Sequence, residues 1–156
     1  MRIIIDADAC PVTRIATDIA KQRSIEVIYV FDTSHFFDDE YAKCVLVDKG
    51  RDCADIVLAN LCTRNDICIT QDYGLASMCL AKGARVIHQD GWEYTQYNID
   101  ALLFQRHASR EYRASGGRTK GPSKRKKSQN QDFFSAFQKL LEEERNEYGK
   151  LRFFST

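Results

Sequence analysis

Residues 1–12 read MRIIIDADACPV, and this stretch decides the fold that we expect. Residues 3–5 are three isoleucines without polar alternation, which is typical of a strand buried on both faces. The run ends at Asp6 and Asp8, and Pro11 then stands where a helix would begin. Two carboxylates therefore follow the C-terminal end of a central strand, where ligands bind in open α/β sheets. They could hold a hard cation such as Mg²⁺ or Mn²⁺, or they could cap the helix and shape the turn.

The chain that follows alternates apolar, β-branched runs with segments of helical spacing. The further predicted strands are residues 25–31, 42–47, 66–70 and 84–88, and the predicted helices are residues 11–23, 52–61 and 72–82. This order predicts an α/β domain with a mostly parallel sheet covered by helices on both faces.

The C-terminal third departs from this pattern. A further helix is expected from residue 98 to about residue 113, which completes a domain of residues 1–113. Residues 114–131 (ASGGRTKGPSKRKKSQNQ) hold almost nothing to bury, so they predict a flexible basic loop. Residues 132–156 predict a C-terminal amphipathic helix that docks on the domain. Its apolar face holds Phe133, Phe137, Leu140, Leu141 and Tyr148.

Composition excludes several classes of protein. The chain has 156 residues, 44% hydrophobic and 29% charged, which fits one globular domain with a sizeable core. No apolar run approaches the roughly 18 residues of a membrane span, and no signal peptide is recognisable, so we expect a cytoplasmic protein without membrane contact. The six cysteines include no C-x-x-C pair and are interpreted as small buried hydrophobes; only Cys10 stands beside the candidate site.

Charge is distributed unevenly along the chain. The net charge is only +1, yet residues 106–127 hold nine Lys and Arg side chains against one Glu, while the preceding residues are acidic overall. Such a segment is either a solvated loop or a contact for a polyanion, and we predict that it binds the phosphate backbone of nucleic acid without reading sequence. The predicted contacts are Arg106, Arg110, Arg113, Arg118, Lys120, Lys124, Arg125, Lys126 and Lys127.

Carboxylates also gather at three points that should share one edge of the sheet. The candidate metal ligands are Asp6, Asp8, Asp52, Asp55 and Asp72. Asp52 and Asp55 open the helix after the third strand, and Asp72 follows the fourth. Each alone is explicable as a helix cap or a first-turn charge. If strands one and four are neighbours, however, these groups converge, and such a cluster suits divalent-metal phosphodiester chemistry.

These residues carry a resemblance to known families. The motifs DADACPV, RDCAD, ITQDYGLAS, KGARVI, QDG with YT, NID, RH and GGRTKGP resemble the YaiI/YqxD family of uncharacterised bacterial proteins over about residues 1–140. The placement of Asp6, of Asp55 before Ile-Val, and of Asp72 after Ile-Thr is also similar to the PIN domain pattern. The resemblance implies a PIN-like five-stranded sheet of order 3-2-1-4-5 and a metal-dependent nuclease, with Asp6, Asp55 and Asp72 as its catalytic metal ligands.

Three functions remain open at this stage. The first is a Mg²⁺- or Mn²⁺-dependent nuclease, with single-stranded RNA as the expected partner. The second is a degenerate PIN-like protein that binds nucleic acid or another partner without catalysis. It is favoured because PIN domains usually supply a further acid from a helix between strands two and three, where this chain has a loop with Asp38, Asp39 and Glu40. The third is a phosphatase of the haloacid-dehalogenase type, since Asp6-x-Asp8 after a strand resembles that nucleophile motif.

Overall fold

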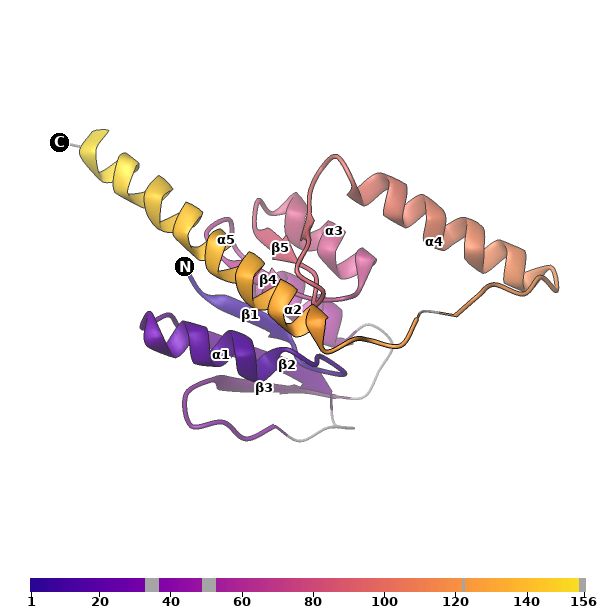
Figure 1. The fold of residues 1–156 in the computed structure, drawn as a ribbon, viewed down its shortest axis with the longest axis horizontal. Helices are drawn as coiled ribbons and strands as arrows, with labels where there is room; N and C mark the ends of the chain where they lie inside the picture. The colour runs from indigo at the N-terminus through magenta and orange to yellow at the C-terminus, as the bar shows by residue number, and fades with distance from the viewer. Residues whose placement is uncertain (33–36, 49–52, 122, 155–156) are drawn as a thin grey trace.

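A computed structural model describes residues 1–32, 37–48, 53–121 and 123–154 (Figure 1). They form an α/β fold around a six-stranded sheet of order β3-β2-β1-β4-β5-β6. The strands are β1 (Ile3–Asp6), β2 (Val27–Asp32), β3 (Lys43–Val47), β4 (Ile67–Ile69), β5 (Arg85–Ile87) and β6 (Glu93–Tyr94). The first five are parallel and lie in the order that the PIN resemblance implies. The sixth corrects the expected count of five: it pairs antiparallel with β5 and, at two residues, is too short to give a periodic signal.

Strand β1 is the centre of the sheet because both of its edges are paired. Ile4 lies opposite Ile28 of β2 on one side and Cys68 of β4 on the other. Side chains alternate across a strand, so Ile3 and Ile5 join the core on one face and Ile4 joins the core on the opposite face. All three are fully buried, as the absence of polar alternation predicted.

Helices cover both faces of the sheet (Figure 1). One core packs α1 (Thr13–Gln22) and α5 (Ser128–Phe154) against the face that carries Ile3 and Ile5. The other core packs α2 (Cys53–Leu61) and α3 (Tyr73–Ala81) against the face that carries Ile4. The fold is therefore a three-layer arrangement, and the C-terminal ends of the parallel strands all lie at one edge of the sheet.

Helix α5 lies across the molecule beside α1. It begins at Ser128, inside the segment that the sequence assigned to a loop of residues 114–131. Its stacked pair Phe133 and Phe137 is fully buried in the core that α1 also contributes to. Arg85 of β5 adds a polar attachment through ion pairs with Glu143 at 2.9 Å and Glu144 at 3.4 Å.

Helix α4 (Ile99–Ala114) behaves differently from the others. It projects from the body of the protein, and the chain returns from its far end to the start of α5 (Figure 1). Ile99 is its only buried residue, and Phe104 is 73% exposed. Within the described ranges, no helix combines the length and the apolar character that crossing a membrane requires.

Candidate functional site

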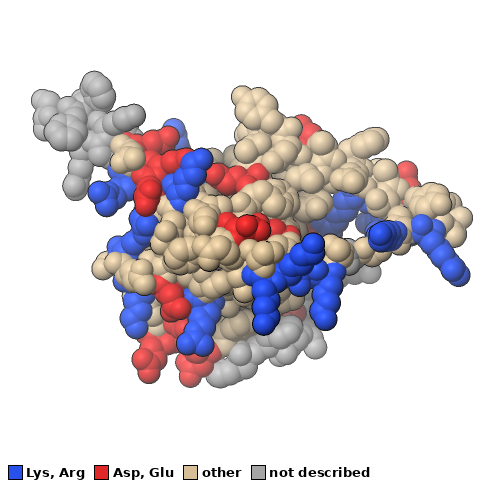
Figure 2. Space-filling view, viewed as in Figure 1, with Lys and Arg blue, Asp and Glu red and all other residues tan. Residues whose placement is uncertain are grey.

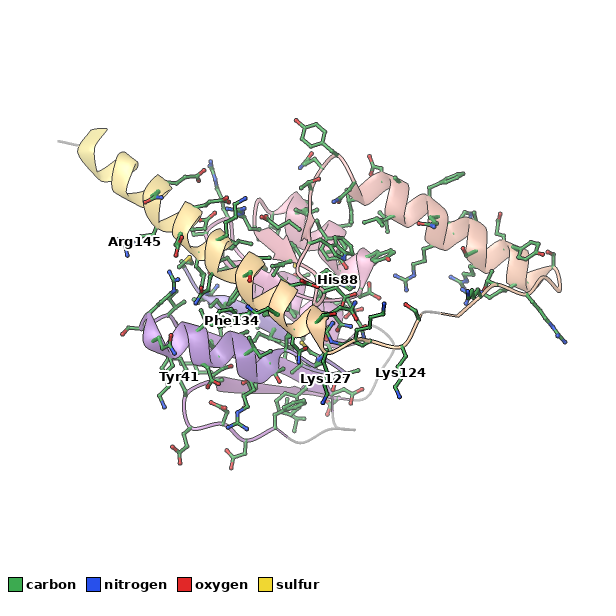
Figure 3. All side chains as sticks on the ribbon, viewed as in Figure 1. Tyr41, His88, Lys124, Lys127, Phe134 and Arg145 are labelled. Carbon is green, nitrogen blue, oxygen red and sulfur yellow. The ribbon has the colours of Figure 1, made fainter. Side chains whose placement is uncertain are left out.

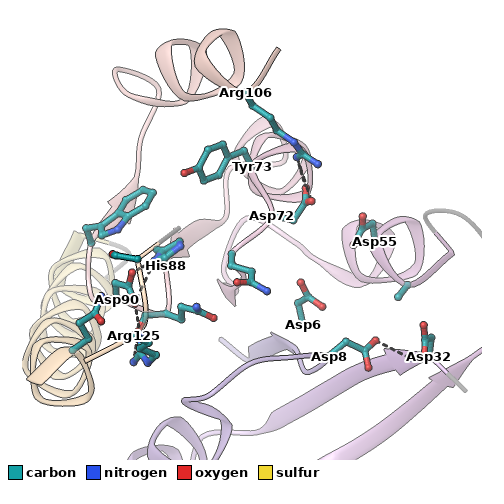
Figure 4. A pocket seen from close by; sticks show the side chains of 16 residues that line it. Asp6, Asp8, Asp32, Asp55, Asp72, Tyr73, His88, Asp90, Arg106 and Arg125 are labelled. Atoms are coloured by element: carbon teal, nitrogen blue, oxygen red, sulfur yellow. Dashed lines mark hydrogen bonds and ion pairs between the residues drawn. The ribbon is translucent and has the colours of Figure 1, made fainter. Parts of the chain in front are cut away.

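A pocket of about 850 Å³ opens at the edge of the sheet where β1, β2, β4 and β5 end (Figure 4). Parallel strands bring the residues that follow them to one edge, so carboxylates distant in sequence share this pocket. Its acidic lining residues are Asp6, Asp8, Asp32, Asp55, Asp72 and Asp90. Of the predicted metal ligands, the structure thus brings Asp6, Asp8, Asp55 and Asp72 to one pocket. Asp52 lies outside the described residues.

Asp6 occupies the inner part of this pocket at the end of β1. The Thr70 hydroxyl donates a hydrogen bond to Asp6 Oδ2 at 2.8 Å and accepts one from the backbone N–H of Asp72 at 3.0 Å. The pKa of Asp6 is raised from 3.8 to about 7. Burial is the largest cause, the Thr70 hydrogen bond opposes it, and the negative charges of Asp55, Asp8 and Asp72 add to the rise. This carboxyl group therefore holds its proton to a much higher pH than an ordinary aspartate, and a cation beside it would favour the charged form.

Asp72 has a structural role as well as a place in the pocket. It is the N-cap of α3, and its Oδ1 accepts a hydrogen bond from the Leu75 N–H at 3.0 Å. Its carboxylate also forms an ion pair with Arg106 at 3.3 Å. Gly74 leaves room for this arrangement, since a Cβ there would lie 3.1 Å from Asp72 Oδ1. The capping and functional interpretations of Asp72 are thus compatible.

Asp8 ties the ends of two strands together. Its Oδ2 accepts a hydrogen bond from the backbone N–H of Asp32 at 2.9 Å, so the loop after β1 is held to the last residue of β2. Asp55 lies in the first turn of α2, as the sequence predicted, and faces the same pocket.

The carboxylates surround the pocket without forming a compact cage. Among the residues that the structure describes, no three His, Cys, Asp or Glu side chains are close enough together to hold one ion directly. Mg²⁺ is commonly bound by only one or two carboxylates while it keeps several of its waters. Separate carboxylates that do not form a compact cage therefore fit a hydrated hard cation and do not fit a fully protein-ligated one.

Two of the nine predicted nucleic-acid contacts belong to the pocket. Arg106 pairs with Asp72, and Arg125 pairs with Asp90 while its Nη2 donates to the Gln89 carbonyl at 3.0 Å and to Asn130 Oδ1 at 2.8 Å. Arg125, which lies in the segment predicted as a flexible basic loop, is thus attached to the body of the protein. The remaining basic side chains are exposed, and none forms an ion pair among the described residues. They are Arg110, Arg113, Arg118, Lys120, Lys124, Lys126 and Lys127.

Some of the exposed basic side chains lie close to acidic surface. Figure 2 shows Lys and Arg side chains beside an acidic patch, over the region where the chain reaches the start of α5. Lys124 and Lys127 lie there, on the connection from α4 and just before α5, as Figure 3 shows. Arg125, on the same connection, lines the pocket. A polyanion that contacts Lys124 and Lys127 would therefore lie near the pocket.

Sequence reasoning missed several residues of the pocket. Asp32 is the last residue of β2, His88 follows β5, and Asp90 and Trp92 lie in the turn between β5 and β6. The rule that singled out Asp6 and Asp72, which looks at polar residues after each parallel strand, would have found Asp32, His88 and Asp90. Trp92 had no such signal, because its position depends on the unexpected strand β6.

His88 is held in one orientation by its neighbours. The Asp90 N–H donates to His88 Nδ1 at 3.0 Å, and the Trp92 indole stacks on the ring with centroids 4.5 Å apart. Burial lowers the pKa of His88, and Arg125 lowers it further against the opposing effect of Asp90. His88 is therefore neutral at pH 7 and presents Nδ1 as an acceptor.

Cys10 is not a nucleophile in this arrangement. Burial raises the pKa of its thiol to about 11, with a smaller contribution from the charge of Asp6. The thiolate is therefore scarce at neutral pH, and Cys10 does not line the pocket.

The fold and the pocket define an α/β protein with a PIN-like strand order and an acidic site at the ends of its parallel strands. The chain belongs to the YaiI/YqxD family: the family described as "Uncharacterized BCR, YaiI/YqxD family" matches residues 4–143. This confirms the resemblance that its motifs suggested.

Curated relatives match over most of their length. A UPF0178 protein of Ruminiclostridium cellulolyticum is 49% identical over 136 residues, which cover 87% of this chain and 89% of the relative. A UPF0178 protein of Natranaerobius thermophilus is 44% identical over 144 residues, covering 92% and 95%. One from Alkaliphilus oremlandii is 52% identical over 113 residues, covering 72% and 73%. No solved structure gives a significant match.

Proposed function

We propose that this protein is a divalent-metal-dependent nuclease that cleaves phosphodiester bonds, with RNA as its preferred substrate. The observation that carries the proposal is the environment of Asp6. This carboxyl group is half-buried in an acidic pocket, and three further carboxylates raise its pKa. Such a concentration of negative charge opposes folding unless a cation neutralises it, so its presence favours a function that needs one.

The residues that would hold Mg²⁺ or Mn²⁺ are Asp6 and Asp72, and Asp8 and Asp55 of the same pocket would contact its bound waters. When bound, such a cation supplies charge stabilisation to a phosphoryl group under attack. Thr70 fixes the positions of these two residues relative to each other, because its hydroxyl contacts the side chain of Asp6 and the backbone of Asp72.

Two arginines of the pocket are placed to bind the substrate. Arg106 and Arg125 each pair with a pocket carboxylate through Nη1, and a guanidinium can exchange a carboxylate for a phosphate. The Arg106 side chain is 54% exposed, so its pair with Asp72 is weakly held and free to exchange. Binding of a cation at Asp72 would release Arg106 toward the phosphate backbone.

The test is cleavage of a labelled single-stranded RNA by the full chain in Mn²⁺ and in chelator. We expect cleavage that requires Mn²⁺, and a loss of at least 100-fold in Asp6→Asn and Asp72→Asn, because both ligands lie at the reacting group. Asp18→Asn, which removes an exposed carboxylate from α1, should cleave at the parent rate. Cleavage that survives in Asp6→Asn, or that persists in chelator, would contradict the proposal.

A second candidate is a binding protein without catalysis on the same fold. It is favoured by the lack of a compact set of three ligand side chains within the described residues. The same experiment separates the two functions. The binding protein retains RNA on a filter in chelator as well as in Mn²⁺ and cleaves it in neither.

A further inference from the structure

One wall of the pocket is aromatic, and the proposed chemistry makes no use of it. Tyr73, His88 and Trp92 line the same pocket as Asp6 and Asp72. They come from three places in the chain: the first residue of α3, the residue after β5, and the turn before β6. Figure 4 shows Tyr73 beside Asp72 and Arg106, and His88 beside Asp90.

A buried tyrosine, Tyr94, packs against all three rings of this wall. Tyr94 of β6 is only 2% exposed and contacts all three: its ring centroid lies 5.9 Å from that of Tyr73, 6.0 Å from that of His88 and 4.6 Å from that of Trp92. His88 and Trp92 also stack with an interplanar angle of 12°. The wall is therefore a rigid surface, and a ligand that stacks on it loses little conformational freedom of the protein.

Core packing alone does not explain why these aromatic side chains also face the pocket. Tyr73 and Trp92 are partly buried against the core of the α2 and α3 face, yet both also line the polar pocket. An aromatic surface among carboxylates and arginines suits a ligand that is itself part aromatic and part anionic. Arg106 pairs with the residue before Tyr73, and Arg125 pairs with a residue two positions after His88, so a cation stands at each end of the wall.

We infer that Tyr73 and Trp92 form a stacking site for one unpaired nucleobase, whose flanking phosphates contact Arg106 and Arg125. This inference rests on the proposed function and deepens it, because a base can reach the wall only when it is not paired in a duplex. The protein would therefore select single-stranded segments or loops, and it would tolerate any base because every base offers an aromatic face.

Trp92 provides the readout, since it is the chain's single tryptophan. The full chain in Ca²⁺ is titrated with an eight-nucleotide adenosine RNA and with an abasic strand of the same length, and tryptophan fluorescence is recorded. We expect the RNA to quench the fluorescence and to bind about tenfold more tightly than the abasic strand. The same RNA annealed to its complement should quench weakly. This comparison needs no variant, so it does not depend on the folding of one.

Variants then locate the site. Tyr73→Ala should lose about tenfold in affinity for the RNA and nothing for the abasic strand, while Tyr73→Phe should retain parent affinity. Tyr97→Ala is the matched control, because Tyr97 is 98% exposed and lies outside the pocket. Equal affinity for RNA and abasic strands, or an unchanged Tyr73→Ala, would overturn the inference. If the stacking site failed this test but the parent protein still cleaved RNA in Mn²⁺, the nuclease proposal would hold and only the stacking inference would be lost. If no strand bound, both would fail.

Discussion

At the level of single residues, the carboxyl group of Asp6 lies where burial and neighbouring charges oppose its ionisation. Its pKa is about 7 in the folded protein, against 3.8 in an unperturbed carboxyl group. Between these two values the native protein binds more protons than the unfolded chain, so its stability falls as the pH rises through this window. Asp6 therefore destabilises the metal-free fold at and above neutral pH.

This predicts a gain of stability in Asp6→Asn that depends on pH. At pH 8 in chelator the variant should be more stable than the parent by up to about 4 kcal/mol, since each pKa unit corresponds to about 1.4 kcal/mol. At pH 5 the gain should be much smaller, because the parent carboxyl group is then protonated in the folded state. Urea unfolding at both pH values measures the difference. Asp18→Asn serves as the control, and an equal gain at pH 5 and pH 8 would refute the electrostatic explanation.

The residues of the pocket differ in how far the sequence revealed them. Asp6, Asp55 and Asp72 could be found because each follows a strand or opens a helix at a known edge of the sheet. The partners of Arg106 and Arg125 could not be found, since Asp72 and Asp90 lie 34 and 35 residues away along the chain. Ion pairs at such separation depend on how α4 and the connection to α5 return to the pocket, which no local pattern specifies.

At the level of elements, the turn between β5 and β6 connects the pocket to α5. Gly91 in this turn has a φ of +89°, and a Cβ there would lie 2.6 Å from the carbonyl carbon and oxygen of Asp132. The backbone of the turn thus packs directly on the backbone of α5. Arg125 also links the turn to α5, because it pairs with Asp90 of the turn and donates a hydrogen bond to Asn130 of the helix.

Gly91→Ala should therefore disturb both the helix and the pocket. The positive φ alone should cost about 1 kcal/mol of unfolding free energy, and the backbone clash should add at least as much again. Gly116→Ala is the matched control, because Gly116 has a φ of +91° with nothing within 4 Å of the added Cβ. Urea unfolding should show the larger loss for Gly91→Ala, and hydrogen exchange should show loosening in the first turns of α5. Equal losses in the two variants would mean that the close packing is unimportant.

Elements with a clear apolar pattern were predictable, including the three-residue strands β4 and β5, whereas elements without one were not. The buried strand β1 and the amphipathic face of α5 each repeat an apolar pattern over several residues, so the sequence predicted both. The start of α5 at Ser128 was missed because the residues before Phe133 are polar and resemble the preceding loop. Strand β6 was missed because it has only two residues, Glu93 and Tyr94. They pair with β5 because the turn at Gly91 reverses the chain.

At the level of the whole molecule, charge is separated between an acidic pocket and an exposed basic connection. Lys124, Lys126 and Lys127 stand near the pocket entrance and are exposed, whereas Arg125 is engaged with Asp90. A cationic surface at this place can attract a polyanion toward a pocket whose own charge repels it. Affinity for single-stranded nucleic acid should therefore fall steeply with salt.

Replacing Lys124, Lys126 and Lys127 together by Ala should weaken binding of every strand tested. It should flatten the slope of log affinity against log salt by about 2, since each lost phosphate contact on a single strand contributes about 0.7. Replacing the exposed Lys21, Lys82 and Lys139 removes the same charge elsewhere and should leave the slope nearly unchanged. Filter binding across a salt series measures both variants. Identical slopes for the two would mean that only net charge matters.

The central claim is that the acidic pocket holds a divalent cation. It is tested most directly by anomalous scattering from crystals of the full chain grown in Mn²⁺. We predict an anomalous peak about 2 Å from a carboxylate oxygen of Asp6, within reach of Asp72, with Arg106 displaced from its ion pair. No peak in the pocket at saturating Mn²⁺, with Asp72 still paired to Arg106, would contradict the account.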